Sequence, residues 1–152
     1  MFAPRFALLV VLLGLPAVGD AQGVVVSPGF VDIEIPLMGT EFGVGVDTSS
    51  ILVWEGSPNS KSKITVQSLA TYAAFDLTVE AVAVERANSV GAVPLTHWMS
   101  PRDLIVNIKK AVGRNAEIQQ ATLRYEARVG SAGPAAAGLF DNHIVLFTIT
   151  QQ

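Results

Sequence analysis

The sequence lacks the residues on which several chemistries depend. It has no cysteine among its 152 residues and only two histidines, His97 and His143. Without thiols there is no disulfide, no thiolate metal site and no cysteine nucleophile. Neither histidine lies in a catalytic or zinc-binding motif, and no Asp-x-Asp-x-Asp-Gly calcium loop is present. We therefore expect a protein that is not an enzyme and that uses no metal or other cofactor.

Charge is also sparse and shows no basic excess. Charged residues make up 15% of the chain, and the formal net charge is −3 at pH 7. Nucleic-acid-binding proteins normally carry a basic stripe that neutralises phosphates, and the sequence has none. Nucleic acid is therefore not an expected partner. The hydrophobic fraction of 50% fits a chain in which many strands bury at least one face.

Residues 1–21 have the pattern of a secretory signal peptide. Arg5 supplies the positive charge, residues 6–15 form an apolar run, and Gly19 and Ala21 are the small residues that a signal peptidase recognises. The apolar run is shorter than the ~20 residues that a membrane-spanning helix needs. We expect cleavage after Ala21, with cleavage after Gly19 as the alternative. The mature chain is then secreted, periplasmic or at the cell surface, and has no transmembrane span.

The remaining residues, 22–152, have the period-two alternation of β-strands. Residues 119–129 are the clearest case, because small and apolar residues alternate there with Thr122, Arg124, Glu126 and Arg128. Similar segments recur about eight times along the chain, separated by glycine, proline and asparagine, and no helical pattern is convincing. The sequence predicts a single all-β domain, an antiparallel immunoglobulin-like two-sheet sandwich of about seven to nine strands.

Individual segments give more detailed expectations. Residues 55–61 have the composition of a hairpin loop between the strands 50–54 and 62–69. Residues 130–138 would be a long hairpin loop if the strands on either side pair with each other. The glycines of residues 39–47 are typical of a bulged or closely approached strand. The last strand has apolar residues on both faces, which favours a central position in its sheet.

Two sets of residues are candidates for contact with other molecules. Val31, Ile33, Ile35 and Leu37 form a candidate assembly strand, which could be added to the sheet of a neighbouring subunit. The simpler alternative, which we favour, is that this strand pairs within its own domain, because consecutive strands usually pair locally. The candidate ligand-contact aromatics are Trp54 and Trp98. For Trp98 we expect a position in the core or plugging a loop, with ligand stacking as the alternative.

The end of the chain carries one family resemblance. The pattern Gly138-x-Phe140-x-Asn142-x-Ile144-x-Leu146 follows a strand that contains Tyr125 and a loop of glycine, alanine and proline. It resembles the closing strand of secreted bacterial fimbrial-type β-sandwich subunits, those related to spore-coat-U-like proteins and chaperone–usher pilins, which show Gly-x-Tyr-x-Asp-x-Val. This chain has Phe and Asn at the Tyr and Asp positions, and it lacks the cysteine pair common in those subunits. The resemblance implies a cell-surface structural subunit.

The sequence therefore leads to two functional hypotheses. We expect a secreted, non-catalytic structural or adhesive subunit of the cell surface, which associates with a protein partner or with copies of itself by strand addition. The alternative is an extracellular or periplasmic module that binds a glycan or a partner protein. An enzymatic interpretation has no support beyond His97 near Asp103.

Overall fold

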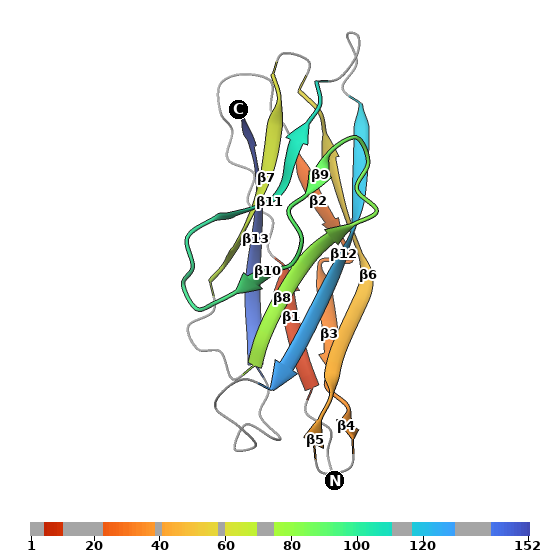
Figure 1. Cartoon of the computed structure of the whole chain (residues 1–152), viewed down its shortest axis with the longest axis vertical. Helices are drawn as coiled ribbons and strands as arrows, with labels where there is room; N and C mark the ends of the chain where they lie inside the picture. The colour runs from red at the N-terminus through yellow and green to blue at the C-terminus, as the bar shows by residue number, and fades with distance from the viewer. Residues whose placement is uncertain are drawn as a thin grey trace.

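The computed structural model in Figure 1 is an elongated sandwich of two β-sheets. The structure describes residues 5–10, 23–38, 41–57, 60–69, 75–110, 117–129 and 141–152. These residues form 13 strands and no helix, and eight of the strands have five or more residues. The predicted all-β sandwich is thus confirmed. In the described part of the chain no helix has the length and apolar character that crossing a membrane requires.

The first sheet has six strands in the order β3-β1-β13-β7-β11-β9. Its strands are β1 (Arg5–Val10), β3 (Phe30–Glu34), β7 (Ser62–Ser68), β9 (Asn88–Ser89), β11 (Arg102–Ile108) and β13 (Asp141–Gln151). Neighbouring strands are antiparallel, except that β1 and β13 are parallel. The closing strand β13 is central in this sheet, as its apolar composition predicted.

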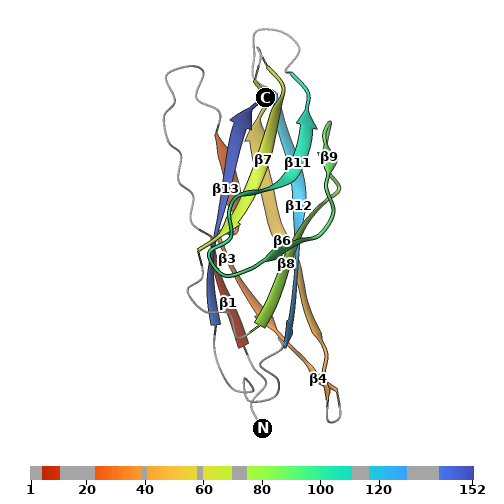
Figure 2. The same ribbon diagram turned by 60° about the vertical axis from the view of Figure 1, so that its left-hand side comes forward.

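The second sheet has five strands in the order β10-β8-β12-β6-β2, all antiparallel to their neighbours. Its strands are β2 (Val24–Ser27), β6 (Val44–Glu55), β8 (Phe75–Val82), β10 (Val93–Leu95) and β12 (Ile118–Val129). A two-stranded ribbon, β4 (Leu37–Met38) and β5 (Glu41–Phe42), extends beyond one end of the sandwich in both views (Figure 1, Figure 2). The chain passes directly from β2 in one sheet to β3 in the other.

Alternation along the strands places one hydrophobic core between the sheets. In β12 the buried residues Ala121, Leu123, Tyr125 and Ala127 alternate with residues that face solvent, because successive side chains of a strand point to opposite faces. The largest fully buried side chains of the described residues include Trp54, Tyr125, Phe75, Phe147, Ile33 and Leu104. Burying one large apolar side chain stabilises the fold by roughly 1.5–3 kcal/mol.

The hairpin predicted at residues 55–61 is wrong, and the condition for a hairpin at residues 130–138 is not met. Residues 55–61 lead from β6 to β7, and these strands belong to different sheets. The strands β12 and β13 also belong to different sheets, so residues 130–138, which lie outside the described residues, do not join a hairpin. Turn-forming residues indicate where a chain reverses, but they carry no information on whether it returns in the same sheet. The chain therefore changes layers at both places.

The alternation of a regular strand is interrupted within β11. A period of two would place Leu104, Val106 and Ile108 on one face, but Leu104 and Ile105 are both fully buried. The register with β7 shifts after Asp103 and again after Ile105. Such an irregularity inserts an extra residue into one strand, which interrupts the period of two.

Gly45 lies where β6 passes close to β3. A Cβ atom at this position would lie 2.7 Å from the carbonyl oxygen of Glu34 and 2.7 Å from Cγ2 of Ile33. Every residue other than glycine therefore has to displace β3. This confirms the closely approached strand that the sequence predicted in this glycine-rich segment.

Candidate functional site

Strand β1 fills the position between β3 and β13, which we call the β1 slot. It pairs antiparallel with Phe30–Glu34 of β3 and parallel with Asp141–Val145 of β13. At the centre of the slot, Leu8 lies opposite Val31 on one side and His143 on the other. Figure 1 and Figure 2 both show β1 between these two strands. In the described structure β1 is the strand that joins β3 to the rest of the sheet.

The walls of the β1 slot are apolar on their core side except at His143 of β13, which is fully buried. Val31 and Ile33 of β3 are 3% and 1% exposed, and Val145 of β13 is fully buried. The alternate residues of β3, Phe30, Asp32 and Glu34, are exposed. Because alternate residues of a strand face opposite sides of the sheet, a strand in the slot has one face toward the core and one toward solvent. The slot therefore accepts a strand with apolar residues at every second position.

The strand in the slot comes from the part of the chain that the sequence predicts to be removed. Residues Arg5–Val10 of β1 lie within the predicted signal peptide, residues 1–21, and include half of its apolar run. If cleavage follows the prediction, β3 and β13 keep their inner faces but lose the strand between them. The slot was not predicted from the sequence, because the residues of β1 have the pattern of a processing segment.

The candidate assembly strand packs against its own chain, and its partner in the described sheet is β1, which lies in the predicted leader. Val31, Ile33 and Ile35 are buried in the hydrophobic core. Leu37 belongs to β4, where its backbone pairs with Phe42. Val31 and Ile33 are thus part of the wall of the β1 slot, so this segment is placed to receive a strand within its own sheet.

The two candidate ligand-contact aromatics differ sharply in their surroundings. Trp54 is 1% exposed, and its indole Nε1 donates a hydrogen bond to Oε1 of Gln119 over 3.2 Å, so this residue is structural. Trp98 is 60% exposed, and its ring meets His97 edge to face with centroids 6.3 Å apart. The expectation that Trp98 fills the core is wrong, because the neighbouring Met99, at 5% exposed, occupies the buried position instead.

His143 is the second imidazole, and it faces the core. From its place at the start of the last strand, an ordinary position on a sheet face is expected. It is fully buried beside the β1 slot, and its Nδ1 lies 3.5 Å from Oγ of Ser68 on the adjacent strand β7. A buried polar side chain of this kind needs a hydrogen-bond partner, and Ser68 contributes one.

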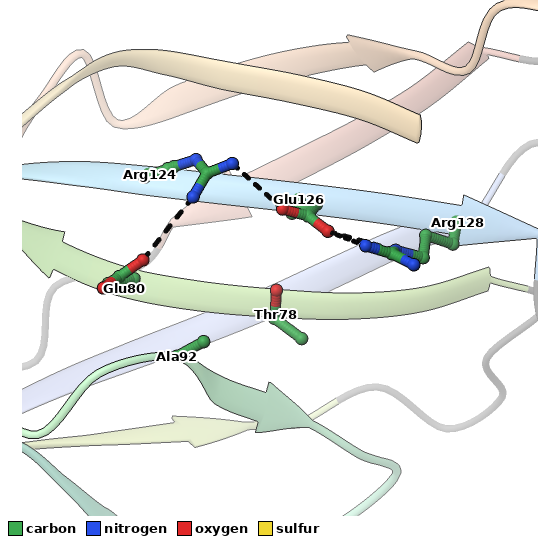
Figure 3. Close-up of a pocket in the computed structure, with 6 residues that line it drawn as sticks. All are labelled: Thr78, Glu80, Ala92, Arg124, Glu126 and Arg128. Atoms are coloured by element: carbon green, nitrogen blue, oxygen red, sulfur yellow. Dashed lines mark hydrogen bonds and ion pairs between the residues drawn. The ribbon is translucent and has the colours of Figure 1, made fainter. Parts of the chain in front are cut away.

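A shallow depression of about 200 Å³ lies on the outer face of the second sheet. Its lining residues come from β8, β12 and the loop before β10: Thr78, Glu80, Ala92, Arg124, Glu126 and Arg128. Figure 3 shows four of them as a row of alternating charges. Arg124 lies 3.7 Å from Glu80 and 3.2 Å from Glu126, which also accepts a hydrogen bond from Nε of Arg128 over 3.0 Å.

This row of charges has no excess of either sign. Its two arginines and two glutamates compensate one another, so it offers no strong field to an ionic ligand. Exposed ion pairs contribute only about 0–1 kcal/mol each to stability. We therefore interpret the row as the solvated face of β8 and β12 and not as a binding site.

The remaining candidate residues do not form a chemical site within the part of the chain that the structure describes. Asp103, considered as a partner for His97, forms an ion pair of 2.8 Å with Lys63. No group of three or more metal-ligating side chains is found among the described residues. A scan against protein-family models and a search of the curated proteins both find no match to this chain. The function is therefore inferred from the β1 slot and the predicted leader.

Proposed function

We propose that this protein is a secreted structural subunit whose sandwich is completed, after export, by a strand from another polypeptide. The observation that carries the proposal is the placement of β1, a predicted leader segment, between β3 and β13. In the precursor the leader supplies this strand. After cleavage another strand has to take its place.

An empty slot is costly for two physical reasons. The facing edges of β3 and β13 carry backbone N–H and C=O groups that β1 satisfies, and such groups are rarely left unpaired in folded proteins. Removing β1 also opens the core beside residues such as Val31 and Val145, which are 3% and 0% exposed. A strand from a neighbouring subunit restores both the hydrogen bonds and the apolar cover, which is the recognition mode known as strand addition.

The fimbrial-type resemblance and the slot involve the same strand. The residues that resemble the closing strand of those subunits include Ile144 and Leu146, which lie in β13. Residues Asp141–Val145 of this strand form one wall of the β1 slot. The resemblance concerns the sequence and the slot concerns the backbone pairing, and both support assembly through β13.

The test uses the chain without residues 1–21 and a synthetic peptide of residues 3–12. We expect the peptide to raise the melting temperature of the mature chain, or to be required for its refolding. The peptide variant Leu8→Lys places a charge opposite Val31, which is buried, whereas Ala7→Lys places the same charge opposite Asp32, which is exposed.

The two peptide variants should therefore differ. An unpaired charge on the core side costs several kcal/mol, so Leu8→Lys should weaken binding at least about tenfold, the equivalent of ~1.4 kcal/mol. Ala7→Lys should bind as well as the unmodified peptide. Equal binding of the two variants, or no effect of any peptide on the mature chain, would rule out the β1 slot as an assembly site.

A further inference from the structure

The free edges of the two main sheets differ in their protection against pairing with another strand. Three edge strands of the described sheets carry a feature that normally prevents it: β3 has the exposed acids Asp32 and Glu34, β9 has two residues, and β10 contains Pro94. The fourth edge strand is β2, Val24–Ser27, which has neither a charge nor a proline. It is the least protected of the four edges.

The backbone groups on the free side of β2 belong to Val24 and Val26. The carbonyl oxygen of Gly23 accepts a hydrogen bond from the N–H of Glu55 on β6 over 3.4 Å. Hydrogen-bonded and non-bonded pairs alternate along an antiparallel ladder, so Val25 and its partner Val53 also form a hydrogen-bonded pair. The N–H and C=O groups of Val24 and Val26 therefore point away from β6, where no described strand pairs with them.

The outer face of the sheet is apolar next to this edge. Val25 is 51% exposed and lies opposite Val53, which is half-buried. In the adjacent row Ile51 is 41% exposed and lies opposite Ser27. This apolar patch contrasts with the charged row on the neighbouring strands β12 and β8, and it is continuous with the unpaired edge.

We propose that β2 is an association edge for a second copy of this chain, which pairs antiparallel about a two-fold axis at Val25. Val24 of each copy then lies opposite Val26 of the other, and these two pairs exchange about four backbone hydrogen bonds. The two Val25 side chains lie directly opposite each other, flanked by the two Val53 side chains. The apolar row thus continues across the junction of the two sheets.

A second copy suits this edge for reasons of symmetry and charge. An antiparallel pair of identical strands is self-complementary about a two-fold axis, and β2 has no charge that would repel its own copy. The edge β3, by contrast, would bring Asp32 and Glu34 of two copies together, and like charges directly opposite are destabilising. Because β2 is short, the association is weak between free subunits, and linking many copies in a filament strengthens it.

This surface is separate from the β1 slot, which lies in the other sheet, and the inference goes beyond the proposed function. The experiment compares the exported chain with the variants Val25→Lys and Val25→Glu, each alone and mixed in equal amounts, by sedimentation equilibrium up to millimolar concentration. The matched control is Val90→Lys, at a residue that is 48% exposed and lies between β9 and β10. Melting temperatures verify that each variant is folded.

We expect the unmodified chain and Val90→Lys to form the same concentration-dependent dimer. Each Val25 variant alone should dimerise at least about tenfold more weakly, because two like charges replace an apolar pair. The mixture should recover the dimer, because lysine then lies opposite glutamate. This recovery is specific to copies that meet at residue 25.

Three results would overturn the inference: a strictly monomeric unmodified chain, a Val25→Lys variant that associates normally, or a mixture that does not recover. If association persists in Val25→Lys but disappears when the peptide of residues 3–12 is added, the copies associate through the β1 slot. That outcome would support the proposed function while excluding the β2 edge. If the mixture of Val25→Lys and Val25→Glu recovers the dimer but the peptide of residues 3–12 never binds, the result would exclude the β1 slot and support the β2 edge.

Discussion

Gly45 provides a direct test of how closely the wall of the β1 slot is held against the opposite sheet. A Cβ atom at this position would lie 2.7 Å from the carbonyl oxygen of Glu34. This oxygen belongs to the backbone of β3, so it cannot rotate away as a flexible side chain would. Ile33, the second contact, is 1% exposed and tightly packed. The variant Gly45→Ala must therefore push β3 away from β6.

The size of the effect follows from these distances. Ordinary van der Waals contacts of a Cβ atom begin at 3.4 Å, so β3 or β6 must shift by about 0.7 Å, the difference from 2.7 Å. Overpacking of this kind costs about 1–3 kcal/mol. Alanine also restricts the unfolded chain, which returns about 0.4–1 kcal/mol. We expect a net loss of about 1–2 kcal/mol in the free energy of unfolding.

The matched control is Gly23→Ala, because a Cβ atom at Gly23 meets nothing within 4 Å. Urea denaturation should show Gly23→Ala within about 0.5 kcal/mol of the unmodified chain. It should show a lower midpoint for Gly45→Ala, and the peptide of residues 3–12 should bind this variant more weakly because its β3 wall has moved. Equal midpoints for the two variants would refute the close approach of β6 to β3.

Two further variants test the core and the exposed turn. Burial of Tyr125, reinforced by the negative charge of Asp47, raises the pKa of its phenol above the ordinary value, so the folded state keeps a proton that the unfolded state loses near pH 10. Stability should therefore fall above about pH 10, by up to about 1.4 kcal/mol per pH unit. Tyr125→Phe should lose less stability above this pH, because phenylalanine has no proton to release. The measurement is the free energy of unfolding from urea denaturation at several alkaline pH values, and the same decrease for both proteins would contradict the prediction. Trp98→Ala should change stability by less than about 0.5 kcal/mol, because the side chain is 60% exposed. A glycan-array signal that disappears in Trp98→Ala would favour a binding module over a structural subunit.

The strands were predictable from the sequence because the alternation of apolar and polar residues within each strand reflects which side chains are buried. The alternation in residues 119–129 reflects which side chains face the core, and Ile118–Val129 is indeed one strand with that pattern. The partner of each strand could not be predicted in the same way, because strand pairing depends on residues that are distant in the sequence. The turn composition of residues 55–61 was therefore compatible with a hairpin, although β6 and β7 lie in different sheets.

The sites were less predictable than the strands. Trp98 and Met99 are adjacent apolar residues, and hydrophobicity alone does not decide which of them enters the core. In the structure Trp98 has a φ of 45° and is exposed, while Met99 is buried. The β1 slot was missed for another reason: an apolar run of a signal peptide and a buried strand have the same composition, so residues 6–15 fit both.

The β1 slot and the β2 edge require partner strands of different chemistry. The β1 slot holds an apolar strand, and its register places Arg5 opposite Glu34 at one end, so a replacement strand with a basic residue at that end is electrostatically favoured. The β2 edge has no charge to complement, and its recognition depends on backbone pairing and on Val25. A neighbour supplying an apolar strand with a basic end is therefore suited to the slot, and an identical uncharged strand to the edge. Because the two surfaces demand different chemistry, one chain can use both without either strand competing for the other's place.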